Sequence, residues 1–411
     1  MLKNISIEEA NKIIEKQKIE LVLIERSILD SFDHVLGEDI RSNMNMPPFD
    51  RSPLDGYAYR AEDTLDARDD NPIILDVIDY VPACHLSSKT IGKGQAMKIM
   101  TGSKIPKGAD VVMRYEDTKF TDSEVTIFQS LSSGSNVVSM GEDMKEGDLV
   151  LEKGILIGPA EIGIMATLGK SIVRVYKKPK IAIIATGDEL INIDGELTEG
   201  KIRNSNSYTV AAQVKRLGGD PVILPICKDG IEETRDRLKS ALRWADMVIT
   251  TGGVSVGDAD LVKEAFQELG ADMLFWRVKM KPGTPIVLAN YENKLLFGLS
   301  GNPAASYITF EQFVRPTILR LMGKSKTRLM EVESILESDF LKTSGQNRYV
   351  RAFTYKEYGK YYTRLPDKHS SGVISSLSGS NSIFHIPSRK GPYKKGDNIL
   401  VELVDYLEVE K

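Results

Sequence analysis

The fold is decided by two stretches of sequence, IAIIATGDEL at residues 181–190 and MVITTGGVSVGDAD at residues 247–260. Each begins as a short apolar run and ends in glycines and acidic residues. A run of this length that is bounded by turn residues predicts a strand buried on both faces, as in a parallel sheet covered by helices. The two stretches therefore predict two strands of one α/β domain.

Strand and helix patterns alternate around these two runs. The expected order is strand 181–185, helix 206–217, strand 222–226, helix 231–244, strand 247–251 and helix 260–269. Alternation of this kind predicts a doubly wound parallel sheet with helices on both faces. We place this α/β domain at residues 179–325, after the basic stretch Lys177-Lys178-Pro179-Lys180.

The rest of the chain predicts further domains, since 411 residues are too many for one core. Residues 1–45 show helical periodicity that begins at a capping box, Ser6 to Glu9, and we group them with 140–178. Short β-rich runs with Pro and Gly punctuation predict an inserted β domain at 46–139. Residues 326–411 predict a C-terminal β domain. The fold class is therefore multidomain, α/β plus β.

Composition excludes several classes of function. The net charge of −4 leaves no basic footprint for nucleic acid. No apolar run is long enough to span a membrane and no signal peptide is visible, so we expect a cytoplasmic protein. Two distant cysteines and four scattered histidines favour neither a disulfide nor a zinc site.

Acidic residues follow three successive predicted strands. Glu189 follows the first strand, Asp229 the second, and Asp258 and Asp260 the third. The carboxyl ends of parallel strands meet at one edge of a sheet, where ligands bind. Clustered carboxylates repel one another, and a cation resolves the repulsion; oxygen ligands at a phosphate site favour Mg²⁺. We predict Glu189, Asp229 and Asp260 as Mg²⁺ ligands, although Asp260 could instead cap the helix that follows it.

The same edge is expected to bind an anion. Glycine-rich turns allow backbone N–H groups to approach phosphate closely, and Lys281 adds a positive charge. Taken singly, each turn is as well explained as a helix cap. The residues of these turns that we expect to bind substrate are Thr186, Gly252, Gly253, Ser255, Ser300, Gly301, Asn302 and Pro303.

Polar residues also cluster beside glycines in and next to the inserted β domain. They are Asp55 in DGYA, Thr101 in MTGS and Asp143 in GEDM. Taken alone, each cluster is typical of a turn.

Together these motifs resemble the molybdopterin molybdenumtransferases over residues 6–403. The strings that carry the resemblance are SPLDGYA (52–58), IMTGSKIPKGADVV (99–112), GEDMKEGD (141–148), ATGDELI (185–191), TTGGVSVGDAD (250–260), MKPGTP (280–285) and GLSGNPAAS (298–306). The resemblance implies four domains and a homodimer in which the β insertion and the α/β domain meet across the interface. It implies that Asp55, Thr101 and Asp143 come from the partner subunit.

The resemblance also implies an activity, the insertion of molybdenum from molybdate into adenylylated molybdopterin with release of AMP, assisted by Mg²⁺. Glu189, Asp229, Asp260 and Lys281 would be the catalytic residues. A molybdopterin adenylyltransferase and acceptor molybdoenzymes would be protein partners. Two alternatives remain: a molybdopterin adenylyltransferase, which normally lacks the insertion and the C-terminal β domain, and a non-catalytic scaffold of the gephyrin type.

The chain departs from the family pattern mainly where molybdate is expected to bind. The departures are Val138 for arginine, Arg277 for lysine, Thr284 for the second lysine of KPGKP, Ser300 for proline and Ala305 for serine. Arg277 keeps the charge with a different geometry, whereas Thr284 does not, and Ser306 is a candidate for the missing hydroxyl. The choice between molybdate and tungstate is therefore left open by the sequence.

Overall fold

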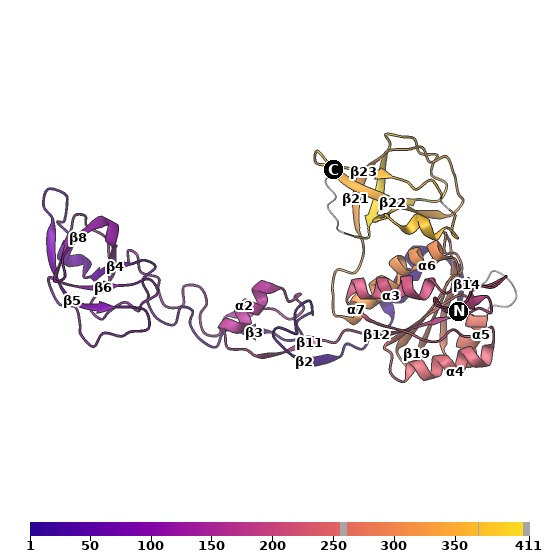
Figure 1. Ribbon diagram of the computed structural model, residues 1–411, viewed down its shortest axis with the longest axis horizontal. Coiled ribbons are helices and arrows are strands. Elements are labelled where there is room, and N and C mark those ends of the chain that lie inside the picture. Colours follow the sequence, from indigo (N-terminus) through magenta and orange to yellow (C-terminus); the bar gives the residue numbers. More distant parts are fainter. Residues whose placement is uncertain (255–260, 369, 406–411) are drawn as a thin grey trace. The chain divides into compact units, whose positions relative to one another are not determined.

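The computed structural model describes residues 1–254, 261–368 and 370–405 (Figure 1). The chain forms two compact units. Unit 1 comprises Met1–Gly37, Gly154–Gly158 and Val173–Lys411, and unit 2 comprises Glu38–Lys153 and Pro159–Ile172.

The predicted α/β domain forms a seven-stranded sheet in unit 1. Four neighbouring strands, β15, β12, β16 and β20, run parallel. The sequence predicts three of them but not β20, and β15 begins and ends earlier in the chain than the predicted strand 222–226. Strand β19 runs antiparallel to both its neighbours, because a short turn joins it to β20 and a hairpin connection requires antiparallel pairing. The strands in sheet order are β1 (Leu2–Ile5), β17 (Asp272–Val278), β19 (Val287–Tyr291), β20 (Lys294–Leu299), β16 (Met247–Thr251), β12 (Lys180–Ala185) and β15 (Asp220–Ile223).

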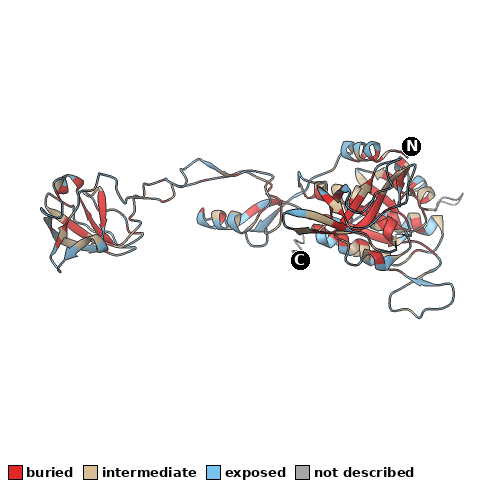
Figure 2. Ribbon diagram, turned by 90° about the horizontal axis from the view of Figure 1, so that it is seen from above, coloured by how far each residue is buried: buried red, intermediate tan, exposed pale blue. Residues whose placement is uncertain are grey.

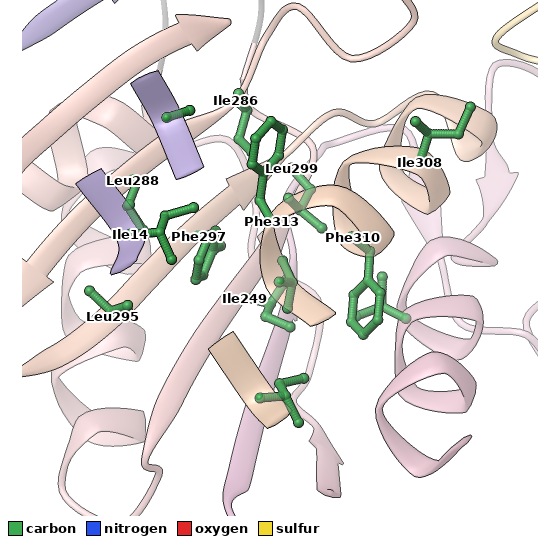
Figure 3. Close-up of a cluster of buried hydrophobic side chains, with 14 of the residues drawn as sticks. Ile14, Ile249, Ile286, Leu288, Leu295, Phe297, Leu299, Ile308, Phe310 and Phe313 are labelled. Atoms are coloured by element: carbon green, nitrogen blue, oxygen red, sulfur yellow. The ribbon is translucent and has the colours of Figure 1, made fainter. Parts of the chain in front are cut away.

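Helices cover both faces of this sheet, because alternate residues of its strands point to opposite sides. Ile181 and Ile183 of β12 belong to one apolar cluster, and Ala182 and Ile184 to the other. Figure 2 shows the buried strands between the two layers, and Figure 3 shows part of the first cluster. The first cluster takes in α1 (Ile7–Lys16), α3 (Asn206–Leu217), α6 (Pro303–Thr309), the π-helix Phe310–Val314 and α7 (Arg315–Leu321), and the second α4 (Ile231–Leu242) and α5 (Leu261–Glu268).

The N-terminal segment packs on the α/β domain. Strand β1 pairs parallel with β17, and the capping box of α1 is present as predicted, with Glu9 N donating to Ser6 Oγ and Ser6 N to Glu9 Oε2. Residues Ile7, Ala10 and Ile14 are buried in the first apolar cluster. The sequence groups residues 1–45 with 140–178, whereas in the structure Met1–Gly37 clusters with the α/β domain. Strand β2 (Leu23–Ser27) pairs with β11 (Ile172–Tyr176).

Unit 2 contains the inserted β domain, a six-stranded sheet. Its strands in order are β7 (Val111–Arg114), β4 (Gly56–Tyr59), β6 (Gln95–Ile99), β5 (Ile73–Val81), β9 (Glu124–Ile127) and β8 (Thr118–Phe120). Two 3₁₀ turns, Ala61–Thr64 and Tyr115–Asp117, lie between these strands. In a separate two-stranded sheet, β3 (Ile40–Arg41) pairs with β10 (Leu149–Leu151), and α2 spans Pro159–Thr167.

The C-terminal β domain belongs to unit 1 and shares a sheet with a short strand of the α/β segment. Met280 and Lys281 of β18 pair with Asn347 and Arg348. This pairing places the Lys281 turn against the C-terminal domain. The strands in order are β18 (Met280–Lys281), β22 (Asn347–Glu357), β23 (Lys360–Arg364), β21 (Met330–Leu336), β25 (Asn398–Leu403) and β24 (Ser382–Ile386), with a 3₁₀ turn at Ile374–Leu377.

Candidate functional site

Backbone hydrogen bonds join the carboxyl ends of three parallel strands, β12, β16 and β20, at one edge of the α/β sheet. Thr186 N, just beyond β12, donates to Thr251 O at 2.9 Å, and Gly252 N, just beyond β16, donates to Leu299 O at 3.1 Å. This edge borders a cavity of about 270 Å³, which we call the crevice. The crevice collects six of the predicted residues: Thr186, Glu189, Gly252, Gly301, Asn302 and Pro303.

Gly252 and Gly253 have backbone conformations that favour glycine, with φ of 92° and 64°. A Cβ on Gly252 would collide with the carbonyl oxygen of Thr186, and one on Gly253 would lie 2.7 Å from Thr186 Oγ1. The TGG turn therefore brings two chain segments closer than side chains allow, which keeps its backbone at the crevice.

We expect Gly252→Ala to lower the free energy of unfolding by about 2–4 kcal/mol, since it adds a backbone collision to the strain of a positive φ. Gly200 is the matched control, with φ of 76° and nothing within 4 Å of an added Cβ. Its replacement by alanine should cost only the backbone strain, about 1–2 kcal/mol. Chemical denaturation of both variants measures the difference, and equal losses would contradict the close approach.

Two of the three predicted metal ligands lie at this edge. The Glu189 carboxylate folds back over Gly187, with Oε2 2.6 Å from the position of an added Cβ, and Glu189 lines the crevice. The side chains of Asp188 and Asp229 each accept a hydrogen bond from the backbone of the other residue. Asp188 N donates to Asp229 Oδ2 at 3.3 Å, and Asp229 N donates to Asp188 Oδ1 at 3.2 Å. Three acidic side chains thus follow β12 and β15. Among the described residues, however, no set of three is close enough to hold a metal ion.

A second cavity, of about 570 Å³, lies between the Lys281 turn, the 300–305 segment and the C-terminal β domain. We call it the basic cavity because Lys281, Lys342, Arg348 and Arg351 line it. Asn302 lines both the basic cavity and the crevice. The backbone of Ala304 donates to Ser371 O at 3.0 Å, so a loop of the C-terminal domain is fixed beside both cavities.

Arg351 is the most deeply buried of the four basic side chains, at 2% exposed. Its Nη2 donates to Ser376 Oγ at 2.6 Å and to Ser370 O at 3.3 Å, and its Nε has no partner among the described residues. Burial lowers the pKa of Arg351, and the described residues include no carboxylate that pairs with it. A buried cation without a counter-ion favours binding of an anion.

Three of the departures from the family pattern lie in this second cavity. Thr284 lines it, but its hydroxyl donates to Met280 O at 2.6 Å and stabilises the turn. The hydroxyl of Ser300 accepts from Asn302 N at 3.2 Å. Ala305 lines the cavity, whereas the hydroxyl of Ser306 is buried and has no partner among the described residues. The cavity nevertheless has four basic residues, three of them from the C-terminal domain.

The remaining predicted residues lie elsewhere. Arg277 stacks over Trp276, 4.2 Å from the ring centre, and lines neither cavity. In unit 2, Asp55 Oδ1 accepts from Thr101 N at 2.7 Å and from Thr101 Oγ1 at 2.8 Å, which lowers the pKa of Asp55. Asp143 is exposed, with its N–H bonded to Met46 O. Ser255, Asp258 and Asp260 lie outside the described residues.

Several lining residues were missed from the sequence. The polar run RNSN at 203–206 directly precedes α3, and a polar cluster at a helix start was a visible signal for it. Arg351 interrupts the apolar run YVRAF, and a charge within a buried strand was a second signal. Lys342 and the loop containing Ser370, Ser371 and Gly372 carried no such signal, because they reach the site only through domain packing.

Comparison with protein-family models defines the class of the protein. Residues 5–169 match the MoeA N-terminal region (domain I and II), residues 182–320 a probable molybdopterin binding domain, and residues 333–404 the MoeA C-terminal region (domain IV). The crevice and its strand ends thus lie in a domain of the molybdopterin-binding type. Among the described residues, no helix has the length and apolar character that crossing a membrane requires.

Full-length relatives narrow the class to a family. The chain is 39% identical over 403 residues to a molybdopterin molybdenumtransferase of Staphylococcus epidermidis, covering 98% of this chain and 96% of that protein. It is 39% identical over 379 residues to the enzyme of that name from Bacillus subtilis, covering 91% and 88%. A molybdopterin biosynthesis moeA protein from Pyrococcus horikoshii superposes with a TM-score of 0.86 at 28% identity, covering 98% of this chain and 100% of that one. The chain belongs to the molybdopterin molybdenumtransferase family, and is therefore a transferase.

Proposed function

We propose that this transferase inserts molybdenum from molybdate into adenylylated molybdopterin and releases AMP. One observation carries the proposal: a glycine-lined crevice and a basic cavity lie side by side and share Asn302. A substrate phosphate group and a separate oxyanion can therefore be held next to each other. Placing two reactants in contact removes much of the entropic cost of their reaction.

The crevice is suited to the pyrophosphate end of the substrate. The TGG turn presents backbone there, and the residues before α3 place the N-terminus of a twelve-residue helix at the same cavity. The partial positive charge of a helix N-terminus favours phosphate. Asn206 Nδ2 donates to Gly301 O at 2.7 Å and so joins the α3 side of the crevice to the GNP turn.

Mg²⁺ would be held by the acidic residues at the same edge together with Asp260, because the described residues alone provide no set of three ligands. Glu189 and Asp229 offer carboxylate oxygens, which Mg²⁺ prefers, and Asp260 is the third ligand that we expect from the sequence. When bound, Mg²⁺ would supply Lewis-acid stabilisation of the phosphate oxygens. The protein groups themselves position the pyrophosphate, through the backbone of the TGG turn and through Asn302.

The basic cavity is suited to molybdate. A dianion placed there would neutralise Lys281 and the buried Arg351, whose side chain has no carboxylate partner among the described residues. The cavity opens beside Asn302, so a bound oxyanion would lie next to the part of the substrate in the crevice. Tungstate has the same charge and shape, and this arrangement does not distinguish it from molybdate by charge alone.

A reconstituted assay tests the activity. Purified protein is supplied with adenylylated molybdopterin, Mg²⁺ and molybdate, and both AMP release and reactivation of a cofactor-free molybdoenzyme are followed. We expect molybdate-dependent AMP release together with reactivation. ATP-dependent adenylylation of molybdopterin instead would favour the adenylyltransferase, and neither activity would favour a scaffold. Repeating the assay with tungstate measures the anion preference.

We further propose that the protein works as a homodimer whose partner subunit supplies Asp55, Thr101 and Asp143 to the site. Exposed apolar side chains in unit 1 support a subunit interface. They are Leu21, Val22, Leu23, Leu29, Phe32 and Leu156. The paired Asp55 and Thr101 support a preformed polar cluster, since Asp55 is only partly buried yet is fixed by two hydrogen bonds from Thr101.

Mixing two inactive variants tests this shared site. Asp55→Asn and Glu189→Gln should each be inactive alone. If Glu189 of one subunit works with Asp55 of the other, each mixed dimer contains one intact site, and random mixing should restore about a quarter of wild-type activity. The Asp55→Asn variant mixed with Asp55→Asn,Glu189→Gln should restore none. No recovery in confirmed mixed dimers would contradict the shared site.

A cytoplasmic location follows from the same proposal, because the reaction belongs to intracellular cofactor assembly. A molybdopterin adenylyltransferase would supply the substrate, and acceptor molybdoenzymes would receive the product. Co-purification with either partner from cytoplasmic extract would support these assignments.

A further inference from the structure

The C-terminal β domain meets the α/β domain through one face of its sheet. Side chains alternate along strands, so Glu402 and Val404 of the β25 segment lie on the same face. That face also carries Ile383, which pairs with Glu402 across the strands. Ile383 and Val404 are buried in the apolar cluster of the α/β domain. Glu402 is therefore a carboxyl group beside the apolar part of this contact between the two domains, which we call the joint.

Several bonds cross the joint. Gln312 Nε2 of the π-helix donates to Glu402 Oε2, and Arg216 of α3 pairs with Asp405 at 3.0 Å. The backbone bond from Ala304 to Ser371 and the pairing of β18 with β22 cross it too. Beside Glu402 the joint encloses a cavity of about 470 Å³.

Charged groups around Glu402 do not neutralise it. Glu331 of β21 lies directly opposite Glu402 in the sheet, and Glu311 of the π-helix lines the same cavity. Like charges in opposite positions of neighbouring strands are destabilising. Among the described residues, Glu402 has no ion-pair partner, whereas Glu311 pairs with Arg216. These surroundings favour the neutral, protonated form of the Glu402 carboxyl group over its ionised form.

The two arginines that line the cavity, Arg320 and Arg328, form their hydrogen bonds and ion pairs with residues other than Glu402. Arg320 of α7 donates to the carbonyl oxygens of Ile14, Glu15 and Gln17 at the end of α1. Arg328 pairs with the Glu15 carboxylate at 2.6 Å. Other titratable groups among the described residues near this face are Glu8 of α1 and, in the C-terminal sheet, Tyr349 and the His385 ring stacked on it. Of these groups, Arg328 acts on Glu402 and opposes the rise in its pKa, but it forms no ion pair with Glu402 among the described residues.

We propose that Glu402 makes the joint pH-sensitive: the C-terminal domain is held closed while this carboxyl group carries its proton, and the joint loosens as the group ionises. Burial raises the pKa of Glu402 to about 7, the Gln312 hydrogen bond opposes that rise, and Glu331 and Glu311 add to it. The closed joint therefore binds the proton more tightly than the open one. Its stabilisation is complete below pH 4.5, the ordinary pKa, and is lost as the pH rises through about 7.

Hydrogen exchange of the full-length protein measures the joint directly. The reporters are peptides that contain Ala304 and strand β22, whose backbone bonds cross the joint, and the references are peptides of β12 and β16 in the central sheet. After correction for the intrinsic pH dependence of exchange, we expect the protection of the reporters to fall on the order of tenfold between pH 5.5 and pH 8, relative to the references.

Variants make the result specific to Glu402. Glu402→Gln should remove the pH dependence and keep the reporters protected at pH 8. Glu333→Gln is the matched control, because Glu333 is exposed on β21 and pairs with Leu400 rather than with Glu402; it should behave as wild type. If Glu402→Gln does not fold, Glu331→Gln should move the midpoint to lower pH by removing the opposing charge. Reporter protection that is independent of pH in the wild type, or an unchanged dependence in Glu402→Gln or in a folded Glu331→Gln, would overturn the proposal.

Discussion

Glu189→Gln should reduce molybdate-dependent AMP release by about 100-fold or more, with no loss of folding. Glu189 lines the crevice, its carboxylate folds over Gly187, and it lies beside the Asp188–Asp229 pair. Glutamine keeps the size and shape of the Glu189 side chain but removes its negative charge, which is needed to bind a cation beside the pyrophosphate. The measurement is kcat/KM for AMP release, with Mg²⁺ varied to see whether more metal restores the rate.

Glu199→Gln is the control for this change. Glu199 is exposed in the loop after β13 (Leu190–Ile191) and lines neither cavity. It should retain wild-type kinetics and Mg²⁺ dependence, since it loses the same charge outside the site. Wild-type turnover in Glu189→Gln would remove the assignment of Glu189 to the metal.

Arg351→Gln should raise the KM for molybdate by about 30-fold or more. The buried guanidinium carries the positive charge that compensates a molybdate dianion for losing its hydration shell in the cavity. Glutamine still provides a donor for Ser376, so part of the loop contact survives. Binding of adenylylated molybdopterin, measured without molybdate, should change little, because Arg351 lines the basic cavity and not the crevice.

The matched control is Arg364→Gln, an exposed arginine on the neighbouring strand β23. It stacks over Phe353 and Tyr355, away from the basic cavity. Molybdate dependence should stay at the wild-type value in this variant. If Arg351→Gln binds molybdate normally while remaining folded, the oxyanion binds elsewhere.

The α/β core was predictable from sequence because its pattern is local. Apolar runs of four to six residues between helical segments specify strands buried on both faces, and β12, β16, α3 and α4 lie where those patterns place them. The TGDE, TGG and GNP turns follow strand ends by chain connectivity alone, so their meeting at one edge also follows. Thr186, Glu189, Gly252, Gly301, Asn302 and Pro303 accordingly border the same crevice.

The contribution of the C-terminal domain was not predictable in this way. Arg348 and Arg351 are about 70 residues from Lys281 in the chain, and the pairing of β18 with β22 brings them together. Nothing in the sequence around Lys342 or Ser370 marks them as part of a binding site. The antiparallel direction of β19 and the packing of α1 on the α/β core are likewise results of long-range contacts.

The sequence by itself determined the α/β fold, the family and the glycine and acidic residues of the crevice, because each depends on short-range patterns and on strand connectivity. Only the tertiary structure decided that four basic residues border one cavity and that the Thr284 hydroxyl is hydrogen-bonded within its own turn. It also placed Glu402 opposite Glu331 at the contact between the C-terminal and α/β domains. The physical reason is that the burial and pKa of a side chain depend on which distant segments of the chain pack around it and exclude water. The local sequence does not specify those segments.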